Sequence, residues 1–125
     1  MITLPDTLQE VFDIVSKHLL AQGKASVDHN SDKTTPFCMY RNPDGLKCAA
    51  GALIPDDKYN TIYEGCGWHG LVNREIIQDK FKEEIGELQQ IHDLAAKQEK
   101  DIPTFWKNQL ANFAKNHKLQ FNTEV

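Results

Sequence analysis

Apolar side chains recur at steps of three and four residues in three stretches of the chain, and this spacing constrains the fold more than any other feature. The first stretch covers about residues 4–22, and its apolar members are Leu4, Leu8, Val11, Phe12, Val15 and Leu19. This spacing gathers apolar side chains on one face of an α-helix. We expect Thr3 to cap the helix at its N-terminus and Gly23 to end it.

The other two helical stretches lie in the second half of the chain. Over about residues 73–97 the pattern predicts one long helix, or two helices broken near Gly86. Asp101 precedes the last stretch as an N-cap, and Pro103 lies in its first turn. From these patterns we expect the hydrophobic core to include Leu8, Phe12, Val15, Leu53, Ile77, Phe81, Leu88, Ile91, Phe105, Leu110 and Phe113.

The segment before residue 48 has a different pattern. Residues 24–36 are polar and lack periodic apolar positions, which predicts a surface loop. The run Asn42-Pro43-Asp44-Gly45 is typical of a tight turn that ends on a glycine at positive φ. We therefore expect a short β-hairpin whose strands are residues 37–41 and 46–48.

Glycine and small residues punctuate the segment that follows. A short helix is predicted near Cys48, a second brief helical segment over residues 56–63, and a glycine-rich loop over residues 65–70. The predicted fold is α+β and mainly α: a compact single domain over residues 1–125 with four or five helices and one short β-hairpin.

Charge and cysteine content exclude several classes of protein. The 14 Lys and Arg residues against 18 Asp and Glu give a net charge of −4, which argues against non-specific binding to nucleic acid. No apolar stretch is long enough to cross a membrane. The first residues lack the pattern of a secretory signal, and the cysteine count is odd, so we expect a cytoplasmic protein with free thiols.

A thiol hydrolase is one function that the residue types permit. Cys48 lies where the hairpin is expected to meet a helix, and backbone N–H groups at such a position can favour a thiolate. His92 would then be the base and Asp93 the carboxylate that orients it. The alternative interpretation is structural, with Cys48 a small core residue and His92 a half-buried helical side chain.

A zinc site is a second possibility. Cys66 and His69 have a C-x-x-H spacing, and Cys38 and Cys48 would complete four ligands if the hairpin folded over them. Zinc-binding modules usually present two tight pairs, whereas these two cysteines lie ten positions apart. We therefore predict no metal and no cofactor.

Non-covalent binding is the third possibility. Arg41 and Lys47 flank the turn, and Trp68 and His69 follow in the glycine-rich loop, a combination of cations and an aromatic ring that suits a nucleotide-type small ligand. Together with Tyr40, these residue types are equally typical of a protein interface. The sequence leaves self-association open.

One run of residues resembles a known group of proteins. It is Cys38-x-Tyr40-Arg41-x-x-x-Gly45-x-Lys47-Cys48-Ala49-x-Gly51-x-Leu53-Ile54-Pro55-Asp56, which we call the signature segment (residues 38–56). It is similar to a segment of short uncharacterised proteins encoded by tailed phages, prophages and some bacteria. Such proteins also tend to carry an L-Q-x-I-H-D stretch, which here is Leu88-Gln89-x-Ile91-His92-Asp93.

The resemblance implies a context and no activity. That context is a phage-type accessory protein that acts in the cytoplasm of a bacterial cell. In the similar proteins a further cysteine often stands where this chain has Ala52. Together with the absence of a convincing catalytic set, the context favours binding to a host or phage protein through residues 37–75.

Overall fold

The computed structural model of the chain describes residues 1–28, 37–95 and 101–121, with only the backbone of residues 28, 37 and 38. Its α-helices are α1 (Leu8–Gln22), α2 (Trp68–Asn73), α3 (Lys82–Ala95) and α4 (Ile102–Asn116). Single 3₁₀ turns span Gly51–Leu53, Asp56–Lys58 and Thr61–Tyr63, and the strands are β1 (Val27–Asp28) and β2 (Phe37–Cys38). The prediction of a mainly helical fold is confirmed.

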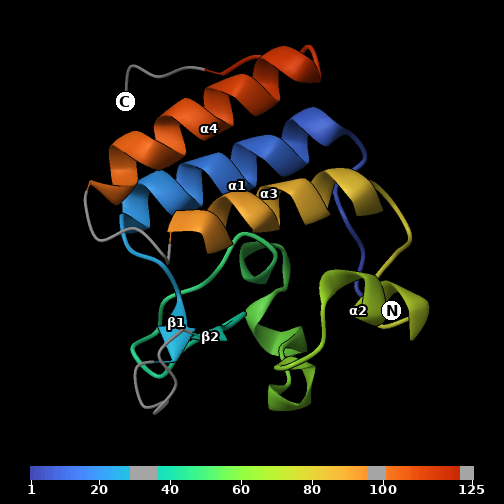
Figure 1. The fold of residues 1–125 in the computed structure, drawn as a ribbon. Coiled ribbons are helices and arrows are strands. Elements are labelled where there is room, and N and C mark those ends of the chain that lie inside the picture. The colour runs from blue at the N-terminus through green and yellow to red at the C-terminus, as the bar shows by residue number, and fades with distance from the viewer. Residues whose placement is uncertain (29–36, 96–100, 122–125) are drawn as a thin grey trace.

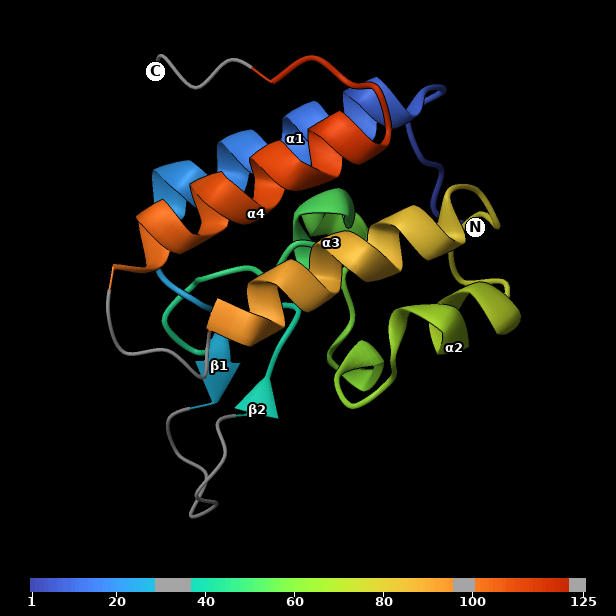
Figure 2. The same cartoon turned by 45° about the horizontal axis from the view of Figure 1, so that its top comes forward.

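The three longer helices pack against one another and enclose the core. Figures 1 and 2 show α1, α3 and α4 close together with the strands and α2 below them, and the 3₁₀ turn Gly51–Leu53 packs against α1. Phe12 of α1 stacks on Phe113 of α4, with ring centroids 5.7 Å apart. Among the predicted core residues, Leu8, Phe81 and Phe105 are only partly buried, whereas the others are buried.

Helix α1 begins later than predicted. Its N-cap is Thr7 and not Thr3, because the Thr7 hydroxyl accepts a hydrogen bond from the Glu10 N–H at 3.2 Å and donates one to the Glu10 carboxylate at 2.9 Å. Pro5 disfavours a helical conformation in the residue before it. The first residues are extended instead, and Ile2 forms a parallel bridge with Ile77. The predicted end at Gly23 is confirmed, with φ of 69°.

The β-hairpin predicted over residues 37–48 is not confirmed. Strand β2 pairs antiparallel with β1, and across the turn the structure has a single bridge between Arg41 and Lys47. The backbone N–H groups of Tyr40 and Arg41 donate to the Glu64 carboxylate, so they do not extend a ladder of strand hydrogen bonds. The turn itself forms as expected, with Gly45 at φ of 84°.

Other predicted boundaries also shift. The surface loop predicted for residues 24–36 contains β1, and residues 29–36 lie outside the described part of the chain. The helical segment predicted near Cys48 is one 3₁₀ turn, and the segment predicted over residues 56–63 is two. Helix α2 occupies part of the predicted glycine-rich loop.

The second half of the chain follows its predicted pattern more closely. The helix expected from residue 73 begins at Lys82, because the backbone of Ile76 and Gln78 bonds to Ile2. Gly86 does not break it. Helix α4 starts after the predicted cap, Asp101.

None of the helices in the described residues is long and apolar enough to span a membrane.

Candidate functional site

A pocket of about 210 Å³ opens between α3 and the segment that leads into α2. Two buried aromatic residues, Tyr40 and Trp68, contribute to its walls. The complete described lining is Met39, Tyr40, Cys48, Glu64, Gly65, Cys66, Gly67, Trp68, Gln89 and Asp93. The pocket therefore combines residues of the signature segment with two side chains of the L-Q-x-I-H-D stretch.

Hydrogen bonds to Glu64 link one wall of the pocket to the signature segment. Its carboxylate accepts the N–H of Tyr40 at 2.9 Å and the N–H of Arg41 at 3.1 Å. The Tyr59 hydroxyl also donates to Glu64, and the Tyr40 hydroxyl donates to the carbonyl of Cys66. These bonds hold residues 64–66 against Tyr40 and fix the shape of that wall.

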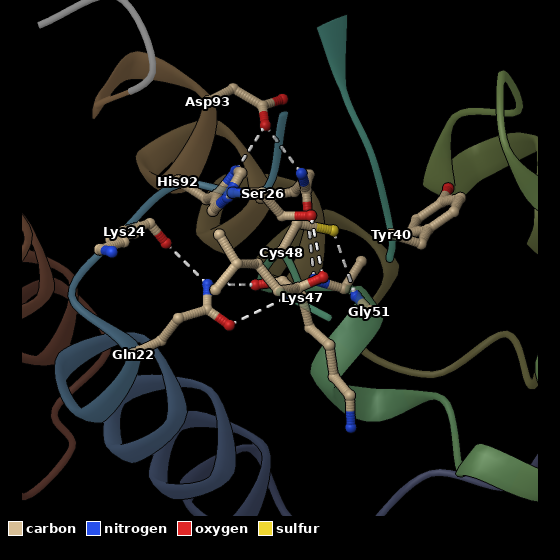
Figure 3. A network of polar contacts seen from close by, with 12 residues as sticks. Gln22, Lys24, Ser26, Tyr40, Lys47, Cys48, Gly51, His92 and Asp93 are labelled. Atoms are coloured by element: carbon tan, nitrogen blue, oxygen red, sulfur yellow. Dashed lines mark hydrogen bonds and ion pairs between the residues drawn. The ribbon is translucent and has the colours of Figure 1, made fainter. Parts of the chain in front are cut away.

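Gln89 and Asp93 form the opposite wall from one face of α3. The side-chain carbonyl of Gln89 accepts the N–H of Ala50 at 2.8 Å, and its amide donates to Oδ1 of Asp93 at 2.8 Å. Nδ1 of His92 lies 2.9 Å from the same oxygen. Asp93 is held from two sides through one oxygen (Figure 3).

The environment of Cys48 does not favour a nucleophile. The thiol is buried, and its sulfur accepts the N–H of Gly51 at 3.3 Å, as Figure 3 shows. Burial raises the pKa of the Cys48 thiol to about 12. At neutral pH the group is a thiol, and a thiol is a poor nucleophile.

His92 is likewise committed to structural contacts. Its side chain is fully buried and its Nε2 accepts the N–H of Ser26 at 2.9 Å. The proton of the neutral ring is therefore on Nδ1, which donates to Asp93. Because both ring nitrogens are occupied, this geometry gives no support to the predicted Cys48, His92 and Asp93 hydrolase, although Cys48 and Asp93 line the same pocket.

Arg41 and Lys47, the predicted cations, are brought together away from the pocket lining. Both pair with Asp56, at 2.8 Å and 3.2 Å. The hydrogen bond from Lys47, then the charges of Lys47 and Arg41, lower the pKa of that exposed carboxyl. The Arg41 guanidinium also donates to the carbonyl of Ile54 and lies over the ring of Tyr59, 4.7 Å from its centroid. These cations already have partners within the chain.

Trp68 and His69 are neighbours in sequence, but only Trp68 lines the pocket. Trp68 is 5% exposed at the start of α2, whereas His69 is exposed and does not line the pocket. In the described part of the chain, no three His, Cys, Asp or Glu side chains are arranged to hold a metal ion. The side chain of Cys38, one of the possible zinc ligands, lies outside that part.

Sequence reasoning missed Glu64 and Gln89 as site residues. Gln89 belongs to the L-Q-x-I-H-D stretch and could have been found there, but Glu64 matches no pattern, because its partners Tyr40 and Arg41 are remote in sequence. Comparisons with protein-family models, with curated proteins and with solved structures find no match to this chain.

Proposed function

We propose that this chain is a small phage-type accessory protein that acts in the bacterial cytoplasm by binding non-covalently to a host or phage protein. The observation that carries the proposal is the pocket between α3 and residues 64–68. Its described lining offers aromatic rings, amide groups and carboxylates for recognition. Its buried thiol and the fully bonded His92 offer no activated nucleophile.

The position of the pocket also supports binding of a protein rather than of a nucleotide. Most of its lining belongs to residues 37–75, the region in which interface-prone residue types are concentrated. The cations that a phosphate would need, Arg41 and Lys47, are paired with Asp56. A volume of about 210 Å³ is below the range of about 300–1,000 Å³ that holds whole small molecules, and it suits one side chain of a partner.

Two glycines allow a test that leaves the core intact. A Cβ at Gly67, in the pocket wall, or at Gly70, outside it, would meet no atom within 4 Å. Gly67→Gln therefore adds a side chain to the pocket lining without a clash at its Cβ, and Gly70→Gln is its matched control. The wild-type protein and both variants are immobilised and used to capture proteins from bacterial lysate, before and after phage infection, with quantification by mass spectrometry.

We expect one protein to be enriched from the lysate by the wild type and by Gly70→Gln but not by Gly67→Gln. A partner that all three proteins capture equally would show that the pocket does not bind it. If the wild type enriches no protein over an unrelated acidic bait, the proposed binding function is wrong.

A further inference from the structure

The charged groups that line the pocket are both acidic. They are Glu64 on one wall and Asp93 on the other, and the described lining contains no lysine or arginine. Burial raises the pKa of the Tyr40 hydroxyl, and so do the neighbouring groups Cys48, Cys66, Glu64 and Asp93. Burial disfavours a charge of either sign, whereas the two carboxylates disfavour only a further negative charge, and it is these carboxylates that suit the pocket to a cation.

The two carboxylates differ in what they still offer. Both oxygens of Glu64 are occupied, by two backbone N–H groups and by the Tyr59 hydroxyl. Asp93 uses Oδ1 for both His92 and Gln89, and its Oδ2 has no partner among the described residues. The Asp93 side chain as a whole is 41% exposed. Asp93 is therefore the acceptor that an incoming donor would meet.

The remaining lining suits the apolar part of a basic side chain. Tyr40 and Trp68 are aromatic, and the sulfur-containing residues Met39 and Cys66 add polarisable surface. Lysine and arginine carry a flexible apolar stem that ends in a charged group, and aromatic rings attract that charge. A stem against these residues would bring an ammonium or guanidinium group towards Asp93.

We infer that the pocket binds a lysine or arginine side chain of the partner protein, with Asp93 as the charge partner. This inference rests on the proposed function, because it names the group of the partner that the pocket recognises. It assigns Asp93 a role different from the one expected in a hydrolase, where its carboxylate would only orient His92.

The experiment uses single amino acids as probes of the pocket. The ¹⁵N-labelled protein is titrated with Nα-acetyl-lysine methylamide, with the arginine equivalent, and with Nα-acetyl-norleucine methylamide, which has the lysine stem without its charge. We expect saturable shifts of the amide signals of residues 65–68 and 89–93 with at least one basic probe and none with norleucine. Binding should weaken as salt is added.

Two aspartates give a matched pair of variants. Gln89 donates to Asp93, four residues later, at 2.8 Å, and on α1 Gln9 and the exposed Asp13 have the same spacing and distance. Asparagine at either position keeps the Oδ1 acceptor but removes the charge. Asp93→Asn should weaken binding of the basic probe about tenfold, whereas Asp13→Asn should leave its affinity unchanged. Gly67→Gln, which adds a side chain to another residue of the pocket lining, should also weaken binding of the probe.

The outcomes separate this inference from the proposed function. Equal binding of norleucine, or unchanged affinity in Asp93→Asn, would overturn the inference. A partner protein that Asp93→Asn still captures and Gly67→Gln does not would also overturn the inference, but it would leave the proposed binding function intact. If the basic probes bind as expected and the wild type captures no protein, the pocket is a site for small cations and the proposed function is wrong.

Discussion

At the scale of single residues, several residues of the signature segment have structural roles within the chain. Gly51 shows this most clearly, because a Cβ built there would lie 2.2 Å from the carbonyl oxygen of Tyr40. That distance is far below van der Waals contact, so the backbone of the segment would have to move. Arg41, Lys47 and Cys48 are also engaged within the chain, by Asp56 and by the N–H of Gly51.

Gly51→Ala is therefore expected to reduce the free energy of unfolding by about 1–3 kcal/mol, the range typical of an overpacked core. Gly70→Ala is the matched control, because a Cβ there meets nothing within 4 Å and the position lies inside α2. Alanine in a helix is favoured over glycine, so this control should gain about 0.5–1 kcal/mol. Urea denaturation measures both, and equal effects would contradict the close contact.

His18 makes the stability depend on pH. Its Nε2 lies 3.1 Å from the carbonyl oxygen of Lys47, and burial lowers the pKa of the ring from its ordinary value of 6.5. The unfolded chain thus takes up this proton at a higher pH than the folded chain. Above pH 6.5 the contribution to stability is complete, and it is lost as the pH falls through 6.5 towards the folded pKa.

His18→Gln keeps a side-chain donor for Lys47 and removes the titration. The free energy of unfolding of the wild type should fall more steeply than that of the variant between about pH 7.5 and about pH 5. Denaturation curves at a series of pH values measure this difference. Parallel curves for the two proteins would show that His18 does not titrate differently in the two states.

At the scale of elements, the boundaries that were predicted correctly are ones that local residues decide, although the local N-cap of α1 is Thr7 and not the predicted Thr3. Gly23 and Asp101 end and begin helices as expected, since a left-handed C-cap and an N-cap depend on neighbours in sequence. Predictions also failed where a remote partner decides. The Glu64 carboxylate accepts the N–H groups of Tyr40 and Arg41, which a longer hairpin would need for strand pairing. Backbone hydrogen bonds to Ile2 keep Ile76 and Gln78 out of the helix that was predicted to start at residue 73.

The shifted start of α1 gives a direct test at this scale. Thr7→Ala removes the capping hydroxyl and should cost about 1 kcal/mol of the free energy of unfolding. Thr3→Ala changes an exposed residue that the sequence suggested as the cap, and it should stay within about 0.5 kcal/mol of the wild type. Thermal or urea denaturation compares them, and a larger loss for Thr3→Ala would place the cap where the sequence put it.

At the scale of the whole molecule, His92 links segments that the sequence could not bring together. Its ring accepts the N–H of Ser26, donates to Asp93 and stacks on Trp106 of α4, with ring centroids 5.7 Å apart. The sequence offered Tyr40 and Trp68 as binding candidates and Asp93 as a member of the hydrolase set, and all three line the pocket. It gave no means of knowing that they share a pocket while Arg41 and His69 lie elsewhere, since only the packing of α3 against residues 64–68 decides this.

Cys48 lines the pocket as a buried structural thiol, and this assignment is what separates the proposed binding protein from a thiol hydrolase. Alkylation by iodoacetamide at neutral pH, followed by peptide mass spectrometry, tests it most directly. In the native protein the half-buried Cys66 should react while Cys48 stays unmodified, and both should react in urea. Native Cys48 that reacts faster than Cys66, at a rate that His92→Gln reduces, would contradict the claim and restore the thiol hydrolase.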